Sequence, residues 1–291
     1  MKKSWIIVCA LLVLAASLVA QDGYKKFELG IFGGYGLPQL QADSQYSSAW
    51  SEDLLQSVNE ETVISAQAKN AFAMGGSAAY FFTPNIGLQL SAGYFNPQVA
   101  TSGNFTFRYT FAGASEVQED HTWTGGGTLN TVPLSLDVVG KVGLGPVELY
   151  ASAGATLFRN SFEADNFVGW GASFEFVWYA PVDQYVDAFQ IPVRIENTSW
   201  TAFGGNFGLG VNVKVIPALG LFLDGRYYFC PAKEMSWQWQ AGTYTGLNNP
   251  NGYFTDWVIT DANLAPFQAM TTTLKVNPSF FSVTAGFKLF L

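Results

Sequence analysis

Charged side chains recur at alternate positions within otherwise apolar segments of this 291-residue chain. Five are cations and four are anions: Lys26, Glu28, Asp137, Lys141, Glu148, Lys214, Asp224, Arg226 and Lys288. Buried charges are tolerated when they are paired and hydrogen-bonded. We therefore expect either a structural network of salt bridges or, as the alternative, the polar lining of a narrow channel.

A second group of side chains with chemical potential is aromatic and lies between those segments. Its members are Phe105, Phe107, Tyr109, Phe111, Trp178, Trp237 and Trp239. Along residues 105–111 the rings alternate with polar residues, which predicts a strand. The rings are expected either to pack on one another or to line an apolar pocket for a small hydrophobic molecule.

Catalytic and metal-binding groups are sparse. The single histidine, His121, follows Glu119 and Asp120, and a lipase or acyltransferase would combine such a histidine with a serine nucleophile. No nucleophile motif is present, so we expect no enzyme, no catalytic residue and no cofactor. Cys230 is the only cysteine outside the N-terminal apolar segment, which leaves no disulfide and no metal site by spacing.

The N-terminus has the three parts of a secretory signal peptide. Lys2 and Lys3 precede an apolar stretch at 5–14, and small or aliphatic residues follow at 15–20. We expect a signal peptide at 1–20 and a mature domain at 21–291, with cleavage after Ser17 as the alternative. The chain is therefore predicted to leave the cytoplasm.

Composition narrows the class of mature protein. Hydrophobic residues make up 49% of the chain and charged residues only 12%, against about 25% in an ordinary soluble domain. After Val19 no stretch approaches the roughly 20 apolar residues of a membrane-spanning helix. A closed β-barrel is the other structure in which all backbone N–H and C=O groups find hydrogen-bond partners within lipid. The net charge of −8 argues against nucleic acid as a partner.

Eight segments alternate apolar residues with small or polar ones, as strands of a membrane barrel do. They lie near 25–37, 71–82, 87–95, 130–141, 147–158, 203–215, 220–230 and 281–291. Turn residues at 83–85, 143–146 and 217–220 predict three tight links. The connections at 38–70, 96–129, 159–202 and 231–279 are long. The sequence thus predicts an all-β protein: an eight-stranded antiparallel up-and-down transmembrane β-barrel with long extracellular loops and periplasmic termini.

A soluble lipocalin-type barrel is the alternative architecture, but it would place its apolar residues inside. The charges of the first group occupy the opposite parity to the apolar side chains, which favours the membrane barrel. The last segment keeps its alternation to Leu291 and resembles the C-terminal signal that the barrel-assembly machinery reads.

Three motifs carry a family resemblance: residues 80–88 (YFFTPNIGL), 132–134 (VPL) and 147–154 (VELYASAG). With them the chain resembles the small outer-membrane β-barrel family that includes OmpW, OmpX and the barrel half of OmpA. The resemblance implies a monomer in the Gram-negative outer membrane, with lipid and lipopolysaccharide as neighbours.

Function divides into three alternatives. The first is a scaffold or a narrow channel or transporter for small molecules, including hydrophobic ones. The second is surface adhesion or recognition through the long loops, which carry acidic residues such as Glu60, Glu61 and Asp120. The third, least favoured, is an outer-membrane lipid-modifying enzyme.

Overall fold

The computed structural model describes residues 25–52, 55–111, 115–177, 182–244, 257–260 and 272–291. In these ranges the regular structure is β-strand, and none of it is a helix long and apolar enough to cross a membrane. The signal peptide expected at 1–20 lies outside the described residues.

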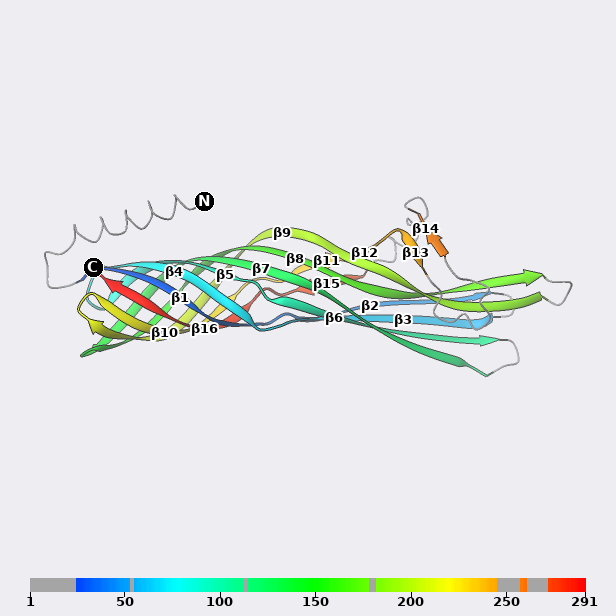
Figure 1. The fold of residues 1–291 in the computed structure, drawn as a ribbon, viewed down its shortest axis with the longest axis horizontal. Helices are drawn as coiled ribbons and strands as arrows, with labels where there is room; N and C mark the ends of the chain where they lie inside the picture. The colour runs from blue at the N-terminus through cyan, green and yellow to red at the C-terminus, as the bar shows by residue number, and fades with distance from the viewer. Residues whose placement is uncertain (1–24, 53–54, 112–114, 178–181, 245–256, 261–271) are drawn as a thin grey trace.

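Eight strands close into an antiparallel ring (Figure 1). In ring order they are β1 (Phe27–Pro38), β4 (Ala71–Phe81), β5 (Ile86–Phe95), β7 (Val117–Leu144), β8 (Val147–Val177), β9 (Val182–Ile216), β10 (Leu219–Phe229) and β16 (Phe280–Phe290). The ladder between β16 and β1 completes the ring. The predicted eight-stranded barrel is confirmed, and its strands lie where the alternation placed them.

The three predicted tight links join β4 to β5, β7 to β8 and β9 to β10. Gly145 in the second link has a φ of 73°, a conformation that a side chain disfavours. The links lie at the same end of the barrel as the C-terminus, because Leu291 pairs with Phe27 while Phe290 donates to the carbonyl of Ala218. We call this the turn end.

Beyond the opposite end of the barrel, β7, β8 and β9 continue, and further strands extend the sheet that they form. These are β2 (Gln41–Glu52), β3 (Leu55–Ala68), β6 (Gln98–Phe111) and β12 (Gln238–Trp239), in the order β12-β9-β8-β7-β6-β3-β2. Two small ribbons accompany them: β11 (Lys233–Ser236) with β15 (Thr273–Val276), and β13 (Gly242–Tyr244) with β14 (Trp257–Ile259). Much of the expected loop sequence is therefore strand, which elongates the molecule (Figure 1). We call the strands beyond the barrel the distal sheet.

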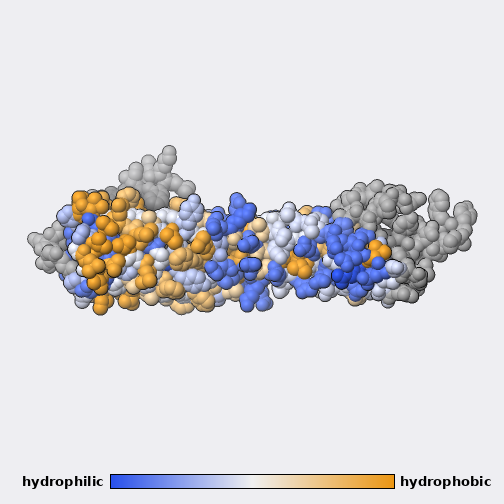
Figure 2. Space-filling view, turned by 90° about the horizontal axis from the view of Figure 1, so that it is seen from below, coloured by the Kyte–Doolittle hydropathy of each residue, from blue (hydrophilic) through white to orange (hydrophobic). Residues whose placement is uncertain are grey.

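The polarity of the wall inverts along β8. In the barrel, Leu149 and Leu157 are 51% and 46% exposed, while Glu148 faces inward and is buried. In the distal sheet, Phe162 is buried and Asp165 is exposed. Figure 2 shows the consequence, with hydrophobic surface around one end of the molecule and hydrophilic surface farther along. The barrel is built for lipid, whereas the distal sheet has the apolar interior of a soluble protein.

A bulge in β9 accompanies this change. Phe162 pairs with Thr198, but Ala164 pairs with Ile195, so β9 carries one extra residue at this point. Such a residue shifts the parity of the strand. Asn206 faces inward in the barrel, whereas the buried Ile195 lies on the opposite parity in the distal sheet.

Candidate functional site

The lumen nearest the turn end holds a cluster of lysines and glutamates. Lys141 of β7 pairs with Glu28 of β1, and Lys288 Nζ lies 3.2 Å from the same carboxylate. Glu148 is shared in the same way, with Lys214 at 2.6 Å and Lys141 at 3.8 Å. The side chain of Lys214 is 36% exposed and the other four are buried. Lys141 therefore links both glutamates into one network, which we call the lysine cluster.

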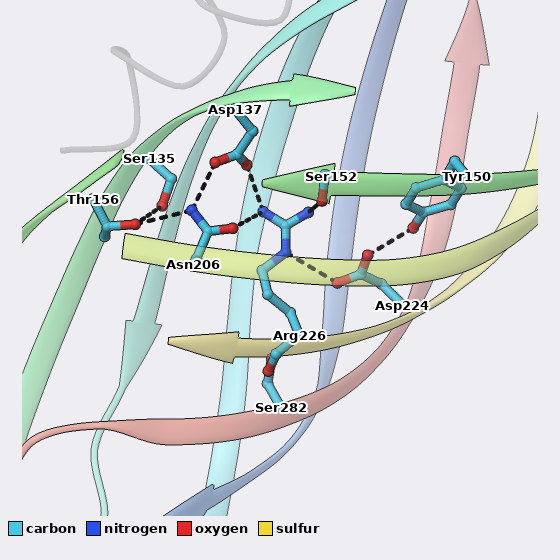
Figure 3. Close-up of polar contacts among 9 residues, drawn as sticks. All are labelled: Ser135, Asp137, Tyr150, Ser152, Thr156, Asn206, Asp224, Arg226 and Ser282. Carbon is cyan, nitrogen blue, oxygen red and sulfur yellow. Dashed lines mark hydrogen bonds and ion pairs between the residues drawn. The ribbon is translucent and has the colours of Figure 1, made fainter. Parts of the chain in front are cut away.

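A second cluster lies deeper, around Arg226 of β10 (Figure 3). Arg226 Nη1 is 2.7 Å from Asp137 Oδ2, and Nε is 3.2 Å from Asp224 Oδ1. The guanidinium also donates to Ser152 Oγ at 3.1 Å and to Asn206 Oδ1 at 3.3 Å. Its donors thus reach β7, β8 and β9 as well as its own strand, so the arginine connects four consecutive strands of the ring. We call this set the arginine cluster.

Neutral side chains complete the arginine cluster. Asn206 Nδ2 donates to Asp137 Oδ1 at 2.6 Å and to Thr156 Oγ1 at 2.9 Å. The hydroxyl of Tyr150 donates to Asp224 Oδ2 at 2.9 Å. Each aspartate therefore accepts from a neutral donor in addition to Arg226. Sequence reasoning did not single out these neutral partners, although their inward parity was a signal for them.

Eight of the nine charges proposed from the sequence come together in the two clusters. Lys26 does not, because it precedes β1 and makes no ion pair with any residue that the structure describes. Its half-buried side chain lies at the turn end.

Four aromatic rings close the lumen on the side of the arginine cluster that faces away from the turn end. Phe280 stacks on Phe95 with centroids 4.4 Å apart and on Tyr228 at 4.6 Å, while Phe158 meets Tyr228 edge-on. All four are buried. We call them the aromatic layer, and sequence reasoning missed it although these rings occupy the inward parity.

Little space remains between these layers. A cavity of about 20 Å³ lies between Arg226, Tyr150 and Lys288, and one of about 10 Å³ borders Phe95 and Phe280. A cavity needs about 10–15 Å³ to hold one water molecule. Neither space admits a small organic molecule.

The aromatic residues proposed from the sequence lie mostly in buried cores of the distal sheet. Phe105 and Phe107 are each 1% exposed and stack at 5.9 Å, and Trp237 and Trp239 are also buried. Tyr109 is half-buried and donates to Glu119. Phe111 ends β6, but its side chain is not described, and Trp178 lies outside the described residues. The structure thus places Phe105, Phe107, Tyr109, Trp237 and Trp239 against other side chains.

Glu60, one of the acidic residues noted in the long connections, is buried in the distal sheet. It is 1% exposed and accepts hydrogen bonds from Ser48 Oγ at 2.9 Å, Trp50 Nε1 at 2.9 Å and the backbone N–H of Gly171 at 3.1 Å. Burial raises the pKa of its carboxyl, although the three donors favour the ionised form. Glu60 therefore joins β2, β3 and β8 at one point.

Sequence comparison agrees with the closed ring and its apolar outer surface. The family model described as "Outer membrane protein beta-barrel domain" matches residues 6–259. The chain belongs to this family. It is accordingly an outer-membrane β-barrel protein, and the apolar band of its barrel faces the lipid of the bacterial outer membrane.

Solved structures similar to this family member include three small outer-membrane proteins. OprG from Pseudomonas aeruginosa has a TM-score of 0.41 at 12% identity, with 92% of this chain and 99% of that chain covered. Neisserial surface protein A has a TM-score of 0.34 at 12% identity, with 93% of this chain and 100% of that chain covered. Ail of Yersinia pestis has a TM-score of 0.29 at 10% identity, with 90% of this chain and 99% of that chain covered. No curated protein matches the chain in sequence.

His121 is placed for packing in this member of the barrel family. Its Nε2 lies 3.7 Å from Glu119 Oε2 and has no hydrogen-bond partner among the described residues. The imidazole stacks on Phe105 at 6.2 Å and on Trp123 at 6.5 Å. Across the described ranges, no three His, Cys, Asp or Glu side chains gather as metal ligands.

The barrel wall has one irregularity between β5 and β7. Their ladder runs from Ile86 and Gly140 to Ala92 and Leu134, then resumes at Phe95 and Thr131. Pro133 lies in the interruption and has no N–H to donate. The 10 Å³ cavity reaches this point and is also lined by Met74 and Tyr94. The ladder between β5 and β7 is therefore interrupted at this point.

Proposed function

We propose that the protein is a monomeric, non-conducting barrel that anchors the distal sheet in the outer membrane and presents it for surface recognition. The observation that carries this proposal is the packing of the lumen between the lysine cluster and the aromatic layer, where paired charges and aromatic rings border cavities of about 20 and 10 Å³. Short turns at one end and long strands at the other favour a periplasmic turn end and an extracellular distal sheet.

Conductance tests the closed lumen. The purified full-length protein should give no current steps in planar bilayers in 1 M KCl at any voltage, while a porin inserted in the same apparatus should conduct. Steps whose size scales with salt concentration would support the channel alternative and contradict the scaffold.

Whole-cell labelling tests the orientation. In a Cys230→Ser background, Asp120→Cys places a thiol on an exposed position of the distal sheet, and Asn85→Cys places one at the turn end. A membrane-impermeant maleimide should label the first variant on intact cells and the second only after lysis. The reverse pattern would overturn the proposed topology.

The outward face of β16 supports recognition by the barrel-assembly machinery. Val283, Phe287 and Leu289 alternate along it and are exposed toward lipid. Leu289→Asp should slow assembly, which heat-modifiability on a gel measures. An unchanged assembly rate would remove this support.

A second candidate function is passage of a small hydrophobic molecule through the wall. The interrupted ladder at Pro133 favours it, because fewer backbone hydrogen bonds must break there. Uptake of a hydrophobic dye into proteoliposomes should then fall in Pro133→Val, which regains an N–H donor. Equal uptake by both proteins would exclude this route.

A further inference from the structure

The turn end contains a hollow that the proposed display function does not use. Its volume is about 390 Å³, and it is lined by Lys25, Lys141, Glu148 and Lys214 together with Pro84, Pro217 and Phe290. The three lysines come from separate parts of the chain. Lys25 precedes β1, Lys141 lies on β7 and Lys214 lies on β9. The three side chains therefore border one space.

The charges at this end do not balance. Lys141, Lys214 and Lys288 share only two carboxylates, those of Glu28 and Glu148. Lys25 adds a further cation, and its Nζ donates to the carbonyl of Phe290, which carries no charge. Even when the C-terminal carboxylate of Leu291 is counted, positive charge remains in excess among the described residues of the turn end, and Lys26 increases that excess.

The compensating negative charge lies deeper in the lumen. In the arginine cluster, Arg226 faces two aspartates. Lys288 Nζ lies 4.7 Å from the Tyr150 ring and 5.2 Å from the Phe222 ring, and a cavity of about 20 Å³ lies between it and Arg226. The lumen is therefore polarised, with its positive side at the hollow.

We propose that the turn-end hollow binds an oxyanion of the phosphate class. Lysine binds phosphate as a point charge, and the partly exposed Lys214 and Lys25 can approach a ligand that enters from the aqueous side. Pro84, Pro217 and Phe290 form an apolar wall that accommodates the organic part of a phosphate ester. Two sources share this chemistry: the headgroup of an anionic phospholipid and a soluble phosphate ester.

Titration of the full-length protein in a neutral detergent at low salt tests the site. The probes are inorganic phosphate, glycerol 3-phosphate, and dihexanoyl phosphatidylglycerol below its critical micelle concentration. Saturable binding, weakened as salt is raised, is the expected result. Lipid binding at least tenfold tighter than that of glycerol 3-phosphate assigns the site to a headgroup, and equal binding assigns it to a soluble ester. No saturable binding of any probe overturns the proposal.

Charge variants separate a binding site from a structural cluster. Lys25→Met removes a cation and leaves every ion pair of the lumen in place, so it should weaken binding at least fivefold without changing heat-modifiability. Glu148→Gln removes an anion from the hollow and should tighten binding. Lys69→Met, an exposed lysine between β3 and β4, should bind as the wild type does. Unchanged binding by both Lys25→Met and Glu148→Gln would contradict the site.

Discussion

Arg226 of β10 and Asp137 of β7 are joined across the lumen, with Nη1 and Oδ2 2.7 Å apart. Two strands, β8 and β9, lie between them in the ring. Lys141 and Glu28 make a similar crossing from β7 to β1, with β4 and β5 between. Ladder hydrogen bonds hold only neighbouring strands, so these two crossings brace the barrel from within and fill it at the same time.

Removing the cation at the first crossing should strongly destabilise the barrel. Arg226→Met leaves Asp137 and Asp224 buried without their positive partner, a loss of about 3–5 kcal/mol by comparison with broken buried ion pairs. Urea unfolding followed by heat-modifiability on a gel measures this. The control is Arg159→Met, because Arg159 is exposed and should change stability little.

A triple variant tests whether the charge itself matters. Arg226→Met combined with Asp137→Leu and Asp224→Leu removes the unpaired carboxylates and should recover much of the lost stability, since buried ion pairs can often be replaced by apolar groups. If Arg226→Met alone loses less than about 1 kcal/mol, the crossing does not brace the barrel.

The barrel was predictable because lipid outside and polar groups inside impose one alternation on every strand. Parity alone therefore placed Asp137 and Arg226 in the lumen. It did not exclude Lys26 from the network, because parity says nothing about where a strand begins. The aromatic layer also escaped prediction, since its rings lie on inward positions where the barrel ends and the polarity starts to invert.

The distal sheet was harder to foresee. Its strands keep the same period as those of the barrel but bury the opposite kind of residue, and the bulge in β9 shifts the parity between Ile195 and Asn206. The burial of Glu60 depends on Gly171, which is 111 positions away in the sequence. Such a contact becomes visible only when the packing of β3 against β8 is known.

Close packing of β8 on the rings of β6 gives a second prediction. A Cβ added at Gly169 would lie 2.0 Å from Phe105 Cγ, and this ring is fully buried. Gly169→Val should therefore destabilise the distal sheet by about 1–3 kcal/mol, as overpacking does. Limited proteolysis of the distal sheet measures this, while heat-modifiability should show an intact barrel.

Gly140→Val is the matched control for this prediction, because a Cβ at Gly140 meets nothing within 4 Å. Its distal sheet should resist protease as the wild type does. Equal protease sensitivity of Gly169→Val and wild type would show that the contact with Phe105 yields without loss.

The buried carboxyl of Glu60 leads us to expect that the stability of the distal sheet depends on pH. Its folded-state pKa is raised above 4.5 by burial, so the protonated form is favoured in the folded state. The resulting stability is fully present below pH 4.5 and is lost as pH rises through the raised pKa. Glu60→Gln should flatten the melting temperature of the distal sheet across this window, as near-ultraviolet circular dichroism would show.

Asp120, in the same sheet, contributes to stability with the opposite dependence on pH. Hydrogen bonds from Gln118 and Thr106 lower the pKa of its carboxyl below 3.8. Its contribution is present above that value and is lost as pH falls through the lowered pKa. Asp120→Asn should therefore leave the pH dependence of the melting temperature above pH 4.5 unchanged. The same pH profile for Glu60→Gln and wild type would refute the role of Glu60.

The last prediction concerns Ser44, which connects three distant parts of the distal sheet. Its hydroxyl donates to the carbonyl of Thr273 at 2.7 Å and accepts from Trp237 Nε1 at 3.1 Å. Trp237 is 1% exposed, so Ser44→Ala leaves a buried indole N–H without its acceptor, a loss of about 1–3 kcal/mol. Ser47→Ala, an exposed serine of the same strand, is the control. Chemical unfolding followed by tryptophan fluorescence compares the two. Equal stability would mean that the indole finds another acceptor, whereas selective loss in Ser44→Ala would show that this hydroxyl holds β2 and β15 to the core.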